Sequence, residues 1–240
     1  MWERVSVRDE SVSSAVQNYL KAIYALRARG ERVATAAIAR TLGVSPGSVT
    51  PMLKRLGEEG LLDYEPYRGV TLTDRGEKTA LRVIRRHRIT EQFLLQVLGL
   101  SWDQVHDEAE QLEHVLSDIV IDRMDDFLGH PSTDPHGDPI PTKEGRVRPD
   151  HSLRLAELEP GDKGVVRRVS DGDPKLLRYA QTLGLVPTRT LEVLRRDPFG
   201  GPLHVQVGDR QHALGEQIAR AVFVDVESRP AGRPESRQRP

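Results

Sequence analysis

Metal-ligating residue types are concentrated between residues 105 and 121. At about 100° per residue of an α-helix, two carboxylates and two imidazoles fall on the flank of one apolar stripe. These four are His106, Glu110, Glu113 and His114. The stripe consists of Val105, Ala109, Leu112, Leu116, Ile119 and Val120. Carboxylates and imidazoles at the border of a core resemble one wall of a metal site, although a solvated acidic face has the same pattern.

The preceding segment, residues 79–98, favours the metal site. Its apolar stripe is Ala80, Val83, Ile84, Leu94 and Leu98. His87 and Glu91 lie within that stripe, one turn apart. A buried glutamate without a partner is costly, so it is neutralised or binds a cation. A hydrogen-bonded His–Glu pair in the core is the alternative, but two such clusters on consecutive helices favour a shared metal site.

Composition limits the kinds of site and of protein. The chain has 240 residues, of which 37% are hydrophobic and 30% charged, which is typical of a globular protein of one large or two small domains. It has no cysteine, which excludes disulfides and thiolate metal sites and favours Mn(II), Fe(II) or a similar cation. No apolar run reaches about 18 residues and no signal peptide is evident, so we expect a cytoplasmic protein without a membrane partner.

Residues 35–58 have the form of a helix-turn-helix. A short helix over residues 35–42, a turn at Gly43 and a second helix beginning at Pro46 are predicted, with Ser45 capping the second helix. The outward face of this second helix carries hydroxyl groups that suit base edges and cations that suit phosphates. Its candidate DNA-binding residues are Ser45, Pro46, Ser48, Thr50, Lys54 and Arg55. Residues 1–76 are only mildly basic, so an ordinary helical hairpin is the alternative.

A wing follows the helix-turn-helix. Residues 61–73 predict two short strands around a turn with Pro66 and Gly69, and Arg68 at the tip would lie over the DNA backbone or minor groove. Helix resumes near Thr73 and, after a break at residues 98–101, a single helix is expected over residues 105–128.

The second half of the chain changes character twice. Residues 130–151, rich in Pro, Gly and Asp, predict a linker or long loop in which His130 and His136 are solvated. Residues 152–226 predict about five short strands with one helix near residues 174–183, hence a small antiparallel barrel. The tail, residues 227–240, is expected to be disordered. With domains at 1–76 and 77–129, the expected fold is mainly α with a small β part.

Several of these stretches together resemble the diphtheria toxin repressor and manganese transport regulator family. The similarity rests on N-Y-L-K-A-I-Y, D-Y-E-P-Y-R-G-V-T-L-T, R-R-H-R-I-T-E-Q-F-L, V-H-D-E-A-E-Q-L-E-H-V-L-S-D and G-D-P-I-P. The resemblance implies a winged helix-turn-helix, a helical metal-binding and dimerisation domain, and an SH3-like domain of the FeoA type. It also implies a homodimer that binds a palindromic operator in double-stranded DNA, with no small organic ligand.

The resemblance assigns roles to individual residues. His87, Glu91 and His106 match an ancillary metal site. Glu110, Glu113 and His114 match the primary site. Manganese-responsive members resemble this chain in having Glu at the position of Glu110, where iron-responsive members have a thiol, so Mn(II) is expected and Fe(II) is tolerated.

The chain also departs from the family pattern. Asn18 stands where the family has Met or Asp as a primary ligand, so either affinity falls or Asp9 or Glu10 compensates. Asp171 and Asp173 are candidates for the ancillary ligand that the SH3-like domain supplies. Pro51 is at a DNA-facing position, where it removes one backbone donor and could contact a thymine methyl.

The leading hypothesis is a manganese-dependent repressor of metal-uptake genes that is not an enzyme. An iron-dependent regulator of the same family is the nearest alternative. A metal-dependent hydrolase is less favoured because no separate nucleophile or general base stands out. A winged-helix sensor of a small molecule, with a purely structural acid/His cluster, and an SH3-like module that binds Pro-rich segments are further alternatives.

Overall fold

The computed structural model describes residues 12–28, 33–65 and 69–228, and the chain divides into two compact units. The first comprises residues up to Arg86 together with Pro141–Arg146; the second comprises His87–Ile140 and the chain from Val147 onward. Arg68, Pro66, Asp9 and Glu10 lie outside the described residues. Of the tail expected to be disordered, residues 227–240, Glu227 and Ser228 end a strand, so the expectation was wrong for these two, and the rest lies outside the described residues.

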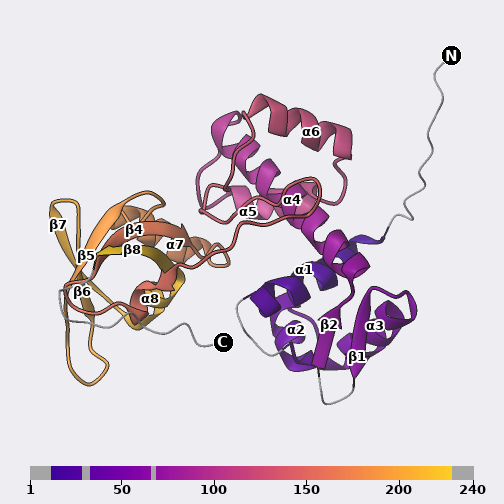
Figure 1. Ribbon diagram of the computed structural model, residues 1–240, viewed down its shortest axis with the longest axis horizontal. Helices are drawn as coiled ribbons and strands as arrows, with labels where there is room; N and C mark the ends of the chain where they lie inside the picture. The colour runs from indigo at the N-terminus through magenta and orange to yellow at the C-terminus, as the bar shows by residue number, and fades with distance from the viewer. Residues whose placement is uncertain (1–11, 29–32, 66–68, 229–240) are drawn as a thin grey trace. The chain divides into compact units, whose positions relative to one another are not determined.

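The first unit is a winged helix-turn-helix, as predicted (Figure 1). Helices α1 (Ser14–Ala28), α2 (Thr35–Leu42) and α3 (Pro46–Glu58) precede an antiparallel hairpin, β1 (Leu62–Glu65) and β2 (Gly69–Leu72). The apolar faces of these elements share one core, which includes Val16, Leu20, Ile23, Ile38, Val49, Leu53, Leu56 and Leu72. Gly43 ends α2 with a left-handed φ of 64°, a conformation that glycine adopts without strain.

The start of α3 differs from the prediction in one bond. Pro46 is the first helical residue, but the Ser45 side chain makes no capping hydrogen bond. The backbone oxygen of Ser45 instead accepts a hydrogen bond from the Ser48 hydroxyl at 2.7 Å. The prediction of a Ser45 cap was therefore wrong, and its hydroxyl is not used to hold the helix end. Helix α3 continues through Pro51 to Glu58.

Helix α4 (Asp74–Gln96) spans both units: its residues up to Arg86 belong to the first unit and those from His87 onward to the second. The second unit continues with α5 (Val105–Leu112) and α6 (Asp118–Phe127). The single helix expected over residues 105–128 was wrong, since Ser117 starts a new helix by accepting a hydrogen bond from Val120 N at 3.4 Å. This break rotates the apolar stripe. Val105 and Ala109 are buried, whereas Ile119 is 75% exposed.

The C-terminal part of this unit is a six-stranded antiparallel sheet in the order β3-β8-β4-β5-β6-β7. Its strands are β3 (Leu153–Arg154), β4 (Lys163–Val169), β5 (Thr190–Arg196), β6 (Leu203–Val207), β7 (Arg210–Leu214) and β8 (Val222–Ser228). A 3₁₀ turn (Leu155–Glu157) and helices α7 (Pro174–Thr182) and α8 (Glu216–Ala221) complete it. The predicted barrel is not closed: among the described residues, β3 pairs only with β8 and β7 only with β6.

Residues 131–140 are an ordered loop of the second unit. Thr133 and Pro139 form an isolated β-bridge, and Asp134 N donates to Asp138 O at 2.9 Å. His130 is exposed as predicted, but His136 has no exposed surface, so its predicted solvation was wrong. His136 is buried because the loop contacts α4 through the hydrogen bond from Gln92 to Thr133 O and contacts β4 through the hydrogen bond from Val169 N to His136 O. No helix in the described ranges combines the length and the apolar character that crossing a membrane requires.

Candidate metal centre and DNA-reading surface

Helix α4 positions the two innermost side chains of the candidate metal centre. His87 and Glu91, one turn apart, are 4% and 0% exposed. The Nε2 atom of His87 lies 3.0 Å from Glu91 Oε1, and its Nδ1 atom lies 2.5 Å from Glu113 Oε2. The two ring nitrogens of His87 therefore face two different carboxylates, one from each predicted site.

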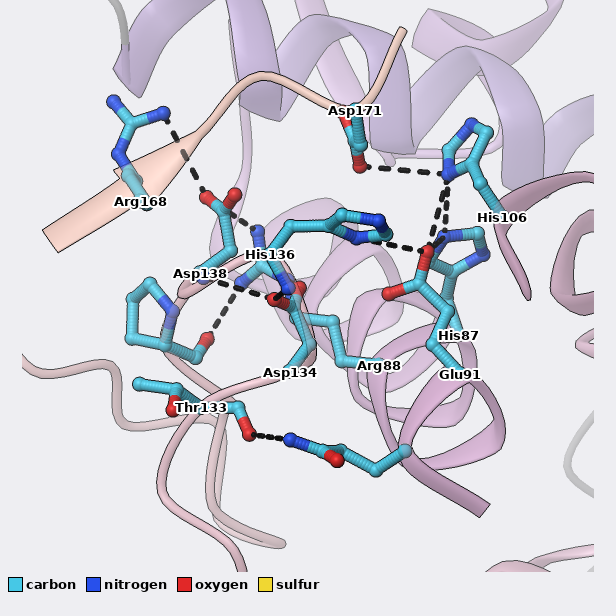
Figure 2. A network of polar contacts seen from close by, with 12 residues as sticks. His87, Arg88, Glu91, His106, Thr133, Asp134, His136, Asp138, Arg168 and Asp171 are labelled. Carbon is cyan, nitrogen blue, oxygen red and sulfur yellow. Dashed lines mark hydrogen bonds and ion pairs between the residues drawn. The ribbon is translucent and has the colours of Figure 1, made fainter. Parts of the chain in front are cut away.

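His106 and Asp171 complete the first group of donors, which Figure 2 shows around Glu91. The Nδ1 atom of His106, on α5, lies 3.2 Å from Glu91 Oε1 and 3.4 Å from Asp171 Oδ2. Asp171 comes from the turn between β4 and α7, which places a carboxylate of the C-terminal part beside the donor atoms of α4 and α5. The other candidate, Asp173, caps α7 by accepting hydrogen bonds from Lys175 N and Leu176 N.

The residues predicted for the primary site gather on the other side of His87. Glu110 Oε1 lies 3.9 Å from His87 Nδ1, and Glu113 is fully buried at the end of α5. His114 Nε2 lies 3.4 Å from Glu113 Oε1. Donor atoms of His87, Glu110 and Glu113 all lie within 4.8 Å of one another. The structure thus brings the two predicted groups together at one imidazole.

Sequence reasoning missed a third group, which Asp134 and His136 form with Glu91. His136 Nε2 lies 2.9 Å from the carbonyl oxygen of Trp102, which only accepts, so this nitrogen carries the proton. In the neutral ring Nδ1 is then a bare lone pair, and it lies 3.7 Å from Glu91 Oε1. The D-P-H-G-D run was the available signal, but its Pro and Gly content indicated a solvated loop.

Unpartnered atoms in this group fit a cation. Glu91 Oε2 and His136 Nδ1 are buried and have no hydrogen-bond partner within the described ranges. Buried polar atoms without partners are uncommon and costly, and carboxylate oxygen with imidazole nitrogen is a donor set for Mn(II) or Fe(II).

The two carboxyl groups of this third group, Glu91 and Asp134, have pKa values shifted in opposite directions. Burial raises the pKa of the Glu91 carboxyl, but His87, His106 and His136 outweigh it, and the pKa falls below its ordinary value. Burial and the negative charges of Glu91 and Asp138 raise the pKa of Asp134 well above its ordinary value. The Arg88 guanidinium, 3.4 Å from Asp134 Oδ2, opposes this rise without cancelling it. A further positive charge at this group would therefore lower its electrostatic cost.

The candidate DNA-reading surface is the outward face of α3. Its residues Ser45, Pro46, Ser48, Pro51, Lys54 and Arg55 are exposed, and Thr50 is half-buried. Arg55 donates to Glu59 Oε1 at 2.7 Å along the helix, so this guanidinium is partly engaged within the protein. The inward residues Val49, Leu53 and Leu56 are completely buried, which leaves the opposite face for a ligand.

Three family models match consecutive parts of the chain. They are described as the iron-dependent repressor N-terminal DNA-binding domain (residues 11–70), the iron-dependent repressor metal-binding and dimerisation domain (residues 73–142) and the FeoA domain (residues 153–226).

Individual proteins agree with the family models. The iron-dependent repressor IdeR of Mycobacterium tuberculosis is 35% identical over 219 residues, which cover 86% of this chain and 95% of the relative. The regulator MntR of Lysinibacillus sphaericus is 39% identical over 114 residues, 48% of this chain and 81% of its own. A solved manganese-dependent transcriptional repressor in complex with manganese superposes with a TM-score of 0.83 at 40% identity, covering 88% of this chain and 99% of that one. The chain therefore belongs to the iron-dependent repressor family of metal-dependent transcriptional regulators.

Proposed function

We propose that this protein is a manganese-dependent repressor that binds a palindromic operator as a homodimer and controls metal-uptake genes. The observation that carries the proposal is the convergence of donors on His87 and Glu91. Buried His87 and Glu91 of α4, with half-buried His106 of α5 and Asp171 of the turn after β4, place their donor atoms within 4.8 Å of one another. A purely structural cluster would be expected to satisfy its buried polar atoms, whereas Glu91 Oε2 and His136 Nδ1 have no hydrogen-bond partner in the described ranges.

The donors fall into two sets that share His87. His87, Glu91, His106 and Asp171, with Asp134 and His136 beside Glu91, would hold one cation. Glu110, Glu113 and His114 would hold the other, to which the family resemblance adds Asn18 of α1 as a candidate ligand. A bound divalent cation would balance the negative charge of these carboxylates. All donors are oxygen or nitrogen, and Glu110 in particular favours Mn(II) over softer cations.

Regulation requires that the metal-bound and metal-free chains differ in DNA affinity. A ligand shifts an equilibrium only by its difference in affinity for the two states. A ten- to hundred-fold effect on DNA binding corresponds to about 1.4–2.8 kcal/mol, which one or two coordinating side chains supply. Asn18 belongs to the DNA-binding domain, and its participation would connect the metal to the domain that carries α3.

Exposed apolar residues on α6 support a homodimer. Ile119 and Phe127 are 75% and 72% exposed, and Val115, just before the helix, is 75% exposed. Exposed apolar residues clustered on one element mark an interaction surface, and the matching family model is described as a dimerisation domain. A second copy of the chain is the occupant we propose for this surface.

The proposal is tested by DNA selection followed by anisotropy. Random double-stranded oligonucleotides are selected with the protein and Mn(II), and the affinity for the recovered sequence is measured with Mn(II) and after chelation. We expect a palindromic sequence and a loss of affinity of at least about tenfold on chelation. Glu113→Ala should abolish the metal effect, whereas Glu108→Ala, which removes an exposed carboxylate from the same helix, should leave it unchanged. Metal-independent binding would refute the proposal.

Iron is the second candidate, and a specific observation favours it. The relative IdeR, at 35% identity over 86% of this chain, is named an iron-dependent repressor. The same anisotropy titration with Fe(II) under anaerobic conditions distinguishes the two. Activation at lower free Mn(II) than free Fe(II) supports manganese, and the reverse order supports iron.

A further inference from the structure

The loop of residues 131–140 lies directly on strand β4. The amide of Val169 donates to the carbonyl oxygen of His136 at 2.9 Å. Next to it, Gly137 has a φ of 95°, and a Cβ at this position would overlap the carbonyl oxygen of Arg167 and lie 2.8 Å from Arg168 Cα. Only glycine allows the two backbones to approach this closely.

The loop that makes this contact is itself held in place. One carboxylate oxygen of Asp134, Oδ1, accepts hydrogen bonds from His136 N and Asp138 N, both at 2.9 Å. Gln92 on α4 donates to the Thr133 carbonyl oxygen at 2.7 Å. The loop is therefore hydrogen-bonded to α4, the helix that carries His87 and Glu91, as well as to β4. It thereby fixes the position of β4 relative to α4.

Asp171 follows directly from the point of contact. It is two residues beyond Val169, at the end of β4, and its carboxylate faces His106. A strand end fixed by a hydrogen bond at Val169 leaves Asp171 little freedom, whereas a strand released from the loop would carry this carboxylate away from the other donors.

We propose that Gly137 is a positioning residue that sets Asp171 in the metal centre. Its missing side chain lets the His136 carbonyl oxygen capture the Val169 amide, and this backbone latch holds the C-terminal sheet at the ligand position. The inference rests on the proposed metal-binding function, although the latch itself is a hydrogen bond between backbone atoms alone. It makes Asp171 a ligand only when the latch is closed.

The latch is tested first in metal-free, full-length protein. Hydrogen exchange of the Val169 amide is measured in wild type, Gly137→Ala, Asp171→Ala and a matched control, Gly129→Ala. Gly129 also has a positive φ, 72°, but no atom lies near its would-be Cβ. We expect faster exchange at Val169 in Gly137→Ala alone, with the amides of β5 and β6 still protected. Unchanged exchange in Gly137→Ala overturns the latch.

Positioning is tested by a double-mutant cycle on Mn(II) affinity, measured by calorimetry. Gly137→Ala and Asp171→Ala should each weaken one class of site by about 10–100-fold, and the double variant should be no weaker than Asp171→Ala. Effects that multiply, or a Gly137→Ala affinity equal to that of Gly129→Ala, overturn the proposal.

A reciprocal measurement keeps the proposal falsifiable if Gly137→Ala does not fold. Linkage requires Mn(II) to slow exchange at Val169 in wild type but not in Asp171→Ala. Equal slowing in both proteins overturns the positioning role. Failure of the proposed metal-binding function would look different from failure of the latch. In that case wild type would bind no Mn(II), but the Val169 amide would still be protected from exchange in the metal-free protein.

Discussion

Replacing His136 with phenylalanine separates its two possible roles. The imidazole is buried, donates to the Trp102 carbonyl oxygen and lies tilted against the Trp102 indole, with ring centroids 5.2 Å apart. Phenylalanine preserves a ring of similar size but provides neither the donor nor the Nδ1 lone pair. The metal-free protein should lose about 1–3 kcal/mol for the unsatisfied Trp102 carbonyl, less whatever the apolar ring recovers by burial.

The metal-bound protein should lose more than this. Loss of one coordinating imidazole is expected to weaken Mn(II) binding by about 10–100-fold, comparable to other changes at metal sites. At a Mn(II) concentration 100 times the wild-type Kd, binding stabilises wild type by about 2.7 kcal/mol. The same concentration would stabilise His136→Phe by only about 1.4 to 0.4 kcal/mol.

The assay is urea unfolding followed by circular dichroism, with and without Mn(II), together with calorimetric titration. His130→Phe is the control, because the His130 side chain is 70% exposed. A variant that is destabilised without metal but stabilised by Mn(II) as strongly as wild type would refute the assignment of His136 as a ligand. It would leave His136 as a structural donor to Trp102.

Three further predictions concern other parts of the chain. Because the pKa of Glu91 is lowered, its ionised form stabilises the metal-free fold above the ordinary glutamate pKa of about 4.3, and this contribution is lost as the pH falls. The difference in unfolding free energy between wild type and Glu91→Gln should therefore be constant above about pH 5 and shrink progressively as the pH falls below it in urea titrations; a difference that stays constant at lower pH would contradict this. Ile119→Asp should convert the dimer to monomer in sedimentation velocity without altering the circular dichroism spectrum, and a persistent dimer would exclude α6 from the interface. Ser45→Ala should change the unfolding free energy by less than about 0.5 kcal/mol, since no cap is lost, whereas Ser117→Ala should cost about 1 kcal/mol; equal costs would contradict the difference in capping.

Local periodicity was sufficient for the parts of the fold that a single helix or hairpin determines. The inward residues of α1 and α3, the hairpin β1–β2, and the burial of His87 and Glu91 all follow from apolar spacing at 3.6 or 2 residues. The break between α5 and α6 did not appear in this way, because no Gly or Pro marks it. The only signal was Ser117, which resembles an ordinary polar residue until its hydrogen bond is seen.

The part of the candidate centre that escaped prediction depends on distant contacts. Asp134 and His136 lie in a stretch without period, and their burial results from the close approach of Gly137 to β4, some 30 residues further along the chain. Helix α8 has six residues, too few for a periodic pattern to be recognised. The open sheet was not distinguishable from a barrel because strand lengths alone do not determine whether the two edges meet.

Trp102 has a consequence for attempts to shorten this protein. The indole belongs to the segment before α5, yet it is 7% exposed and is part of the same buried apolar cluster as Leu177 and Val169 of the C-terminal part. A chain truncated after residue 150 would lose the apolar side chains of the sheet that cover this ring, and the newly exposed indole surface would add to the exposed apolar residues on and before α6. Excising the sheet is therefore not a clean route to a minimal repressor unless position 102 is first made polar.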